Sequence, residues 1–226
     1  MSPFVAALVG ALLGFALGWL SAWLTERLQP PEDTAAIKRR GALVRDPFVQ
    51  GGLAIVGAAI PLVLSDSPPI RWLEAGLLAV PLVQVTVTDF RARYVYTVVA
   101  AIGLVFGLAF GWHVHPGSWP SGVLGGAAWL SSVVGAVGGG LAFGALYAIG
   151  RLIYRGGEPM ARGDVTIAAM VGAEAAACVL QALVLGVLLG GVLALAVWAS
   201  SRSRHAFMPY GPGLCLGGLL TLFVAC

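Results

Sequence analysis

Residues 157–168 read Gly-Glu-Pro-Met-Ala-Arg-Gly-Asp-Val-Thr-Ile-Ala, and this stretch decides how the rest of the chain is interpreted. It predicts a positively charged turn, then a glycine, then a hydrophobic helix with Asp164 in its first turn. A second carboxylate, Asp89, interrupts another long apolar run upstream. Holding an ionisable group at the edge of hydrocarbon is costly, so such a residue is a functional-site candidate whose partner must be found. We expect Asp89 and Asp164 to be each other's partner.

The composition is that of a polytopic membrane protein. Of the 226 residues, 59% are hydrophobic and 10% are charged, and the mean hydropathy is +0.92, values outside the range of ordinary soluble domains. Several runs with few or no charges have the length of roughly 20 residues that a helix needs to cross the hydrocarbon. The period-2 alternation of an outer-membrane barrel is absent from the sequence, so helical spans are expected.

The pattern predicts an all-α fold with about eight transmembrane helices in a single membrane-embedded domain, residues 1–226. The predicted spans are Pro3–Leu24, Pro47–Leu64, Leu73–Phe90, Val95–Trp112, Val123–Gly150, Val165–Ala173, Cys178–Ala199 and Tyr210–Ala225. The run after Asp164 is long for one span and tight for two, so we place a turn at Gly172-Ala173-Glu174. Glu174 is expected to cap or line that turn.

The distribution of Lys and Arg predicts the orientation of these spans. Of the 13 basic residues, 12 fall in alternate connections, and Arg71 alone lies on the other side. The twelve are Arg27, Lys38, Arg39, Arg40, Arg45, Arg91, Arg93, Arg151, Arg155, Arg162, Arg202 and Arg204. The positive-inside rule then places both termini outside and both candidate acids on the cytoplasmic side. For Arg162 and the segment 38–40 we favour a role in setting topology over binding of lipid headgroups.

Each acid also has a simpler explanation. Asp164, after Gly163 at the start of a helix, is a favoured N-terminal capping residue. Asp89 could pair with Arg93 one turn later, although it lies where the helix dipole disfavours negative charge. If the two carboxylates face each other, they share one proton, so one can act as general base on water while the other polarises a carbonyl. The sequence contains no nucleotide-binding, HExxH or GxSxG motif.

Cysteines and histidines predict no metal site. The spacing of Cys178, Cys215 and Cys226 lacks CxxC and argues against a zinc site and a disulfide framework, which leaves small buried hydrophobes as the interpretation. His113 and His115 form an HxH pair that we interpret as part of a surface loop.

Together these residues resemble the prepilin peptidases (type IV leader peptidases), a branch of the GxGD membrane aspartic proteases. The resemblance runs over nearly the whole chain, and its first helix matches Gly10–Leu28. The stretch Gly156–Gly172 is similar to the GxGD block, where Ala161, Arg162, Gly163 and Asp164 occupy the motif. Thr88-Asp89-Phe90-Arg91 is similar to the block that carries the first catalytic Asp. Residues 207–213, which include Pro209, Gly211 and Pro212, resemble the segment before the last helix.

The resemblance implies an aspartic endopeptidase of a bacterial-type inner (cytoplasmic) membrane with Asp89 and Asp164 as the catalytic pair. Its substrates would be type IV prepilins or pseudopilins, whose short basic leaders are removed at the cytoplasmic face before pilus or type II secretion assembly. No nucleic-acid partner is expected.

Three departures from the family pattern bear on this function. Ala161 replaces the first glycine of the motif, and Val95-Tyr96 stands in place of an Ile-Pro. Many members carry a four-cysteine zinc insert after the first helix, whereas residues 29–46 form a short loop without cysteine. We therefore expect no zinc, and the reduced loop argues against an S-adenosylmethionine-dependent methyltransferase activity. A transporter or assembly scaffold that uses the same acids for ion or proton binding, or a protease-like chain that has lost activity, remains an alternative.

Overall fold

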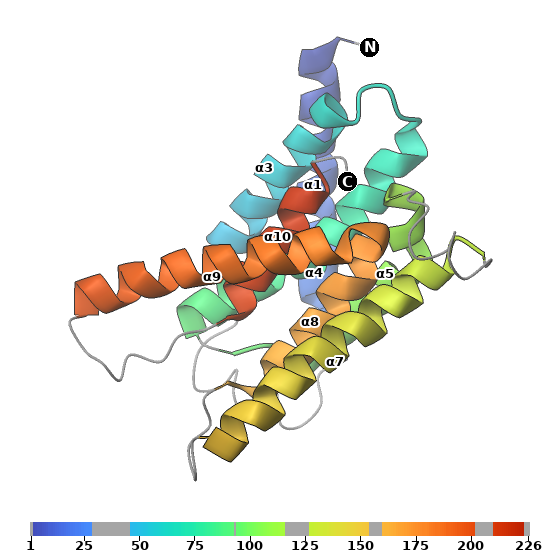
Figure 1. The fold of residues 1–226 in the computed structure, drawn as a ribbon. Coiled ribbons are helices and arrows are strands. Elements are labelled where there is room, and N and C mark those ends of the chain that lie inside the picture. Colours follow the sequence, from blue (N-terminus) through green and yellow to red (C-terminus); the bar gives the residue numbers. More distant parts are fainter. Residues whose placement is uncertain are drawn as a thin grey trace.

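The computed structural model describes residues 2–28, 46–92, 94–115, 127–153, 160–201 and 210–223. Within these ranges the structure consists of helices and their connections (Figure 1). The helices are α1 (Pro3–Arg27), α3 (Pro47–Val63), α4 (Pro69–Ala92), α5 (Thr97–Val114), α7 (Leu130–Ile153), α8 (Arg162–Ala175), the 3₁₀ helix η2 (Ala176–Cys178), α9 (Val179–Ser201) and α10 (Gly211–Thr221).

The helices have the length and composition of a multi-pass membrane protein. Among the described residues, five stretches could cross a membrane: α1, α4, α5, α7 and the bent stretch Arg162–Val197, which joins α8 to α9. Two further apolar helices, α3 and α10, are shorter. For the described residues, the expected all-helical architecture with several candidate membrane spans is confirmed, whereas the count of eight crossings stays a prediction.

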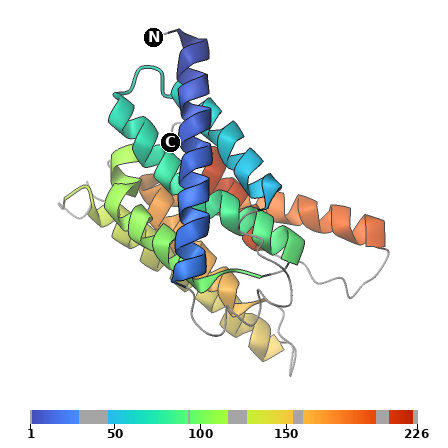
Figure 2. The same cartoon turned by 180° about the vertical axis from the view of Figure 1, so that it is seen from behind.

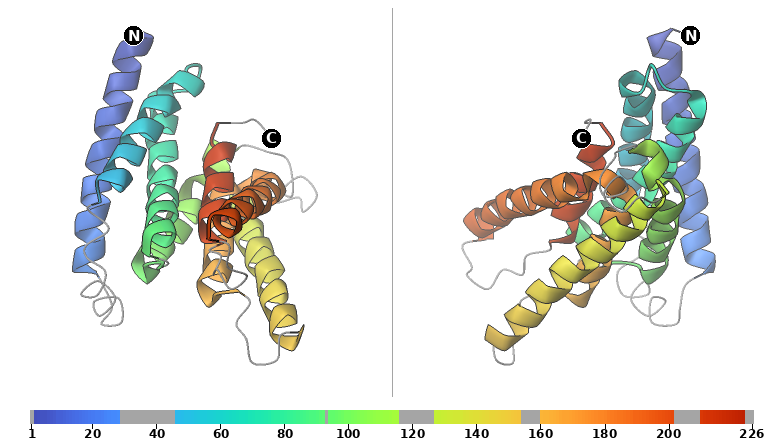
Figure 3. Two further views of the ribbon diagram at one scale, coloured as in Figure 1. Left: turned by 90° about the vertical axis from the view of Figure 1, so that its left-hand side faces the viewer. Right: turned by 45° about the vertical axis from the view of Figure 1, so that its right-hand side comes forward.

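One side of the molecule is built from α1, α3 and α4. Figure 2 shows α1 running along this side, and the left view of Figure 3 shows the three helices next to one another. Glycines let the backbones of α1 and α3 approach closely, because a Cβ at Gly14 would lie 3.2 Å from the Cα of Gly57. This is the small-residue packing typical of helices in lipid.

The centre of the other side is α8, which contacts α5, α7, α9 and α10. Nine of its 14 residues are buried. Its contact with α7 depends on two facing glycines, since a Cβ at Gly172 would lie 2.7 Å from the carbonyl carbon of Gly135. Figure 1 shows α9 crossing the bundle, and it packs on α10, where a Cβ at Gly213 would lie 2.5 Å from the Cα of Gly190.

The expected turn after Asp164 exists but lies slightly later than predicted. α8 continues through Gly172 to Ala175, and the chain turns at Ala176, a non-glycine residue with a φ of 46°. Gly172 packs closely against α7 and does not form the turn. Turn propensity alone does not distinguish these two roles of a glycine. Cys178, which follows the turn, is disulfide-bonded, whereas Cys215 is free. The expectation of unbonded cysteines was wrong for Cys178 because sequence spacing does not reveal which cysteines the fold brings together.

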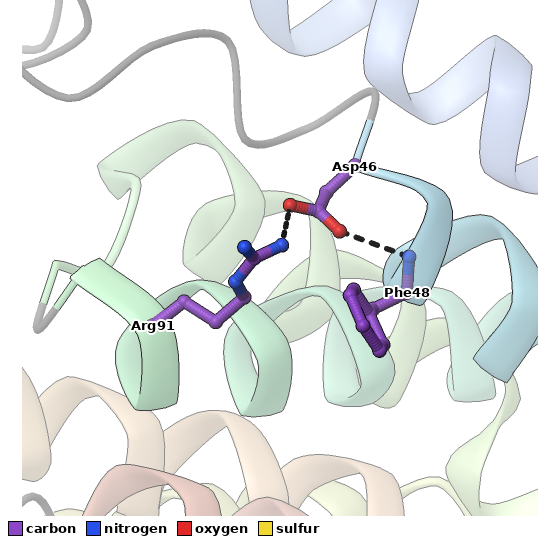
Figure 4. A network of polar contacts seen from close by, with 3 residues as sticks. All are labelled: Asp46, Phe48 and Arg91. Atoms are coloured by element: carbon purple, nitrogen blue, oxygen red, sulfur yellow. Dashed lines mark hydrogen bonds and ion pairs between the residues drawn. The ribbon is translucent and has the colours of Figure 1, made fainter.

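Four of the five described arginines gather at one end of the bundle (Figure 1), which we call the basic end. It contains Arg27 at the end of α1, Arg91 at the end of α4, Arg151 at the end of α7 and Arg162 at the start of α8, whereas Arg71 lies at the start of α4. At the basic end, Asp46 accepts a hydrogen bond from the Phe48 backbone N–H (2.9 Å) and forms an ion pair with Arg91 (Figure 4). This contact joins the start of α3 to the end of α4.

Candidate functional site

Three helices place the candidate residues close together at the basic end. Asp89 lies in the last turn of α4, Asp164 in the first turn of α8, and Gly211 is the first residue of α10. Both acids are buried, with 7% of Asp89 and 5% of Asp164 exposed. Residues separated by 75 and 47 positions in the chain therefore meet around the start of one short helix.

Asp164 is held by the backbone at a helix N-terminus. Its Oδ2 accepts a hydrogen bond from the Ala161 N–H at 3.2 Å, which satisfies a donor just outside α8. The positive end of the helix dipole also favours a carboxylate here. Asp164 is therefore not the N-cap residue that the sequence predicted, because Ala161 is the N-cap and Asp164, at the third helical position, accepts the N–H of Ala161.

Gly211 is the point at which the two acids meet. A Cβ at this position would collide with the Asp89 Oδ2 and would lie 2.8 Å from the Ile167 Cδ1. The backbone amide of the same glycine faces the Asp164 carboxyl. A side chain at this position would force Asp89 or Ile167 to shift, so the glycine leaves room for the approach of Asp89.

Cys215 is a site neighbour that the sequence interpretation missed. It lies one turn after Gly211 on α10, is fully buried, and is within electrostatic reach of Glu174, Asp89 and Asp164. Thr86 of α4 contacts its thiol. The spacing of four residues places Cys215 and Gly211 on the same face of α10, and this spacing is the signal in the sequence that could have identified Cys215.

Polar residues of α4 continue from Asp89 toward α1. The Thr88 hydroxyl donates to the Gln84 carbonyl at 2.8 Å, and the Gln84 side-chain oxygen accepts from the Ser21 hydroxyl of α1 at 2.9 Å. These bonds satisfy hydroxyl groups in an apolar bundle, where an unpaired polar group is costly. They tie α1 to the helix that carries Asp89.

The remaining motif residues have different surroundings. Gly163 is half-buried, and a Cβ there would lie 3.9 Å from Val95. Pro212 is buried beside Gly211, while the exposed Arg162 directs its Nε to the Tyr147 hydroxyl at 3.2 Å. Pro209, Arg93 and the loop 29–45, to which the predictions on zinc and methylation refer, lie outside the described residues.

At the end opposite the basic end, the buried side chains of Glu174 and His115 contain polar atoms without a hydrogen-bond partner among the described residues. Glu174 is 1% exposed, and neither of its carboxyl oxygens has a hydrogen-bond partner among the described residues. Of the two roles expected for Glu174, capping or lining the turn, the structure shows the second, because Glu174 lies two residues before Ala176 and no described residue bonds to its carboxyl. The Nε2 of His115 likewise has no partner within the described part of the chain, and burial lowers the pKa of His115 to about 4. In contrast, Glu74 bonds to His113 at 2.9 Å.

Chemically, the basic end brings two acids and a backbone amide together in a buried site. Two neighbouring carboxyls can hold one proton between them and present both a base and an acid to a bound water. Among the described residues, no three His, Cys, Asp or Glu side chains gather as metal ligands. Comparison of the chain with protein-family models, curated proteins and solved structures found no match.

Proposed function

We propose that this chain is a membrane aspartic endopeptidase of the prepilin peptidase type, with Asp89 and Asp164 as its catalytic pair. The observation that carries the proposal is the meeting of these two buried carboxyls at Gly211. It is supported by the resemblance of three separate sequence blocks, around Asp89, Asp164 and Gly211, to that family. The fold draws parts of these three blocks to one place.

In the proposed reaction the two acids share one proton. We assign the negative charge to Asp164, because it lies at a helix N-terminus and accepts the Ala161 N–H. It takes a proton from water as the water oxygen attacks the scissile carbonyl carbon, while Asp89 donates its proton to the carbonyl oxygen. When the tetrahedral intermediate collapses, the C–N bond breaks, the departing amine takes a proton from Asp164, and Asp89 recovers one from the hydroxyl group.

The proposed substrates are type IV prepilins or pseudopilins in a bacterial-type inner membrane. Four of the five described arginines lie at the basic end, and the positive-inside rule assigns such an end to the cytoplasm. The substrate's basic leader would also remain in the cytoplasm for this reason. The peptide bond at the junction of the substrate's leader and its apolar helix would then lie at the same depth in the membrane as the two acids.

The test is processing of a co-expressed candidate prepilin, followed as loss of the leader on a gel and by mass spectrometry. Wild-type protein should remove the leader, and Asp89→Asn and Asp164→Asn should each reduce the rate by about 100- to 10,000-fold, the usual contribution of general acid–base groups.

A matched control is Glu74→Gln, which changes a buried acid of α4 at the opposite end of the bundle. It should leave processing within a few-fold of wild type. Normal processing by both aspartate variants would exclude the dyad mechanism. If Glu74→Gln also lost processing, the losses in the aspartate variants would be explained by impaired folding.

A further inference from the structure

The two described cysteines lie toward opposite ends of the bundle and differ in redox state. Cys215 lies in α10, one turn after Gly211 at the basic end, and its thiol is free. Cys178 is the last residue of η2, at the end opposite the basic end, and it is disulfide-bonded. Because Cys215 is free, the bonding partner of Cys178 lies outside the described residues.

This distribution matches the two compartments that a bacterial inner membrane separates. Thiols stay reduced in the cytosol, whereas disulfides form and persist in the periplasm and in other oxidising spaces. The positive-inside rule assigns the basic end to the cytoplasm. The free thiol of Cys215 then lies toward the reducing side, and the disulfide of Cys178 lies toward the oxidising side. Arginine distribution and cysteine chemistry are independent features, and they indicate the same orientation.

The disulfide follows a strained corner between α8 and α9. Ala176 has a φ of 46° and a ψ of −110°, a backbone conformation that residues with a side chain rarely adopt. Glu174, two residues earlier, is 1% exposed, and neither of its carboxyl oxygens has a partner among the described residues. Unfavourable features of this kind persist only where their surroundings hold them in place. A covalent bond at Cys178, two residues after Ala176, is such a restraint.

Helices α5 and α7 restrain the same corner by close packing. A Cβ at Gly111 of α5 would lie 2.9 Å from the Glu174 carbonyl oxygen, and a Cβ at Gly135 of α7 would lie 3.4 Å from the Ala176 carbonyl oxygen. The backbone of the corner therefore fits between two glycines and has little room to move. Since α8 is one continuous helix with Asp164 in its first turn, the corner at its last turn also fixes the position of Asp164.

We propose that the Cys178 disulfide is introduced on the extracytoplasmic side by a disulfide-carrying thiol oxidase and locks the α8–α9 corner at Ala176. A cysteine thiolate of this chain attacks the oxidase disulfide and forms a mixed disulfide. The second cysteine thiolate then displaces the oxidase sulfur, and the S–S bond of this chain closes. Two electrons and two protons pass from the two thiols to the oxidase, whose disulfide becomes a dithiol. The proposed partner is therefore an oxidant of protein thiols.

The first experiment follows the disulfide in cells by uptake of a mass-adding maleimide. Protein is trapped in acid after a short pulse of synthesis, denatured, and alkylated with or without prior reduction. The chain has three cysteines, so wild type should take up one maleimide before reduction and three after it. In a host that lacks its extracytoplasmic thiol oxidase, wild type should take up three without reduction. Cys215→Ser should take up none before reduction in the normal host, which assigns the free thiol.

The second experiment measures the lock by thermal unfolding of the purified protein in detergent. Cys178→Ser should lower Tm by roughly 5–15 °C, the loss expected for a native disulfide in a chain of this length. Cys215→Ser is the matched control, because it replaces a buried sulfur that forms no disulfide, and it should shift Tm by less than about 5 °C. Ala176→Gly removes the cost of the positive φ and should raise Tm by about 2–4 °C.

Prepilin cleavage tests whether the lock positions Asp164, and this readout alone rests on the proposed function. Cys178→Ser should cleave about tenfold more slowly at a temperature at which it is folded, because a misplacement of about 1 Å can cost 100-fold. Ala176→Gly in the same background should recover part of the rate. If Cys178→Ser does not fold, wild-type protein from the oxidase-deficient host supplies the reduced form. Absence of cleavage by oxidised wild type would contradict the proposed function and leave the alkylation and unfolding results intact.

Four results would overturn the proposal. The first is uptake of three maleimides by unreduced wild type from the normal host. The second is full disulfide formation in the host that lacks the oxidase. The third is a Tm of Cys178→Ser equal to that of wild type, or lowered no more than that of Cys215→Ser. The fourth is cleavage by Cys178→Ser at the wild-type rate, which would show that the lock does not reach Asp164.

Discussion

The two ends of α8 bury carboxyl groups in opposite ways. At the basic end Asp164 lies in the first turn, where it accepts the Ala161 N–H and meets the Gly211 backbone. At the other end Glu174 lies in the last turn, where no described residue offers it a hydrogen bond. The helix dipole favours a carboxylate at the first position and opposes one at the second. Burial alone therefore does not distinguish the two acids, whereas their backbone environment does.

After substitution of the aspartates themselves, the largest effect is expected from filling the space that Gly211 leaves beside Asp89 at the basic end. Gly211→Ala would push a methyl group into Asp89 and Ile167. Displacement of a reacting group by about 1 Å can cost 100-fold in rate, so leader cleavage should fall by about that factor. The rate is measured with the co-expression assay or with purified protein and substrate.

Gly191→Ala is the matched control, because a Cβ at this glycine of α9 meets nothing within 4 Å. It should leave cleavage unchanged and should raise stability slightly, as Gly→Ala does in a helix interior. Full activity of Gly211→Ala would show that catalysis does not need the close approach of Asp89 to α10.

At the opposite end, His115 should make stability dependent on pH. Its pKa is lowered by burial to about 4 in the folded protein, whereas the unfolded chain takes up the proton near pH 6.5. The unfolded state therefore binds more protons between these values, so stability should fall by about 3 kcal/mol as the pH drops from 7 to 4. Thermal unfolding in detergent as a function of pH measures the slope.

His115→Gln should remove most of this slope, because the amide does not titrate. His113→Gln, whose side chain is half-exposed, should retain a slope of the same sign. Equal slopes in wild type and His115→Gln would contradict the assignment of the effect to His115.

The two buried glutamates at this end should respond with opposite signs to the same substitution. Glu174→Gln replaces an acid that has no described partner, and should stabilise the protein by about 1 kcal/mol because a neutral amide costs less to bury. Glu74→Gln weakens the hydrogen bond to His113 and should destabilise the protein by about 1 kcal/mol. Denaturation midpoints of both variants at one pH give the comparison, and destabilisation by Glu174→Gln would reveal a partner for that carboxyl.

The smallest effects are expected at the surface of the basic end (Figure 4). Asp46→Ala removes both the cap of α3 and the ion pair, and should cost about 1 kcal/mol. Arg91→Gln removes only the ion pair, in which the Arg91 side chain is 44% exposed, so it should cost less than about 0.5 kcal/mol. Equal losses for Arg91→Gln and Asp46→Ala in thermal unfolding would show that the ion pair, and not the cap, accounts for the contribution of Asp46.

The sequence by itself determined that the chain is a helical, multi-pass membrane protein, because long apolar runs have few other stable structures in lipid. It also identified Asp89 and Asp164, since acids within such runs are conspicuous. Only the tertiary structure decided that both acids meet at Gly211, that Gly172 packs against α7 instead of forming the turn, and that Cys178 is disulfide-bonded. These features depend on distances between residues far apart in the chain, and helix packing sets those distances through close contacts of backbone with backbone.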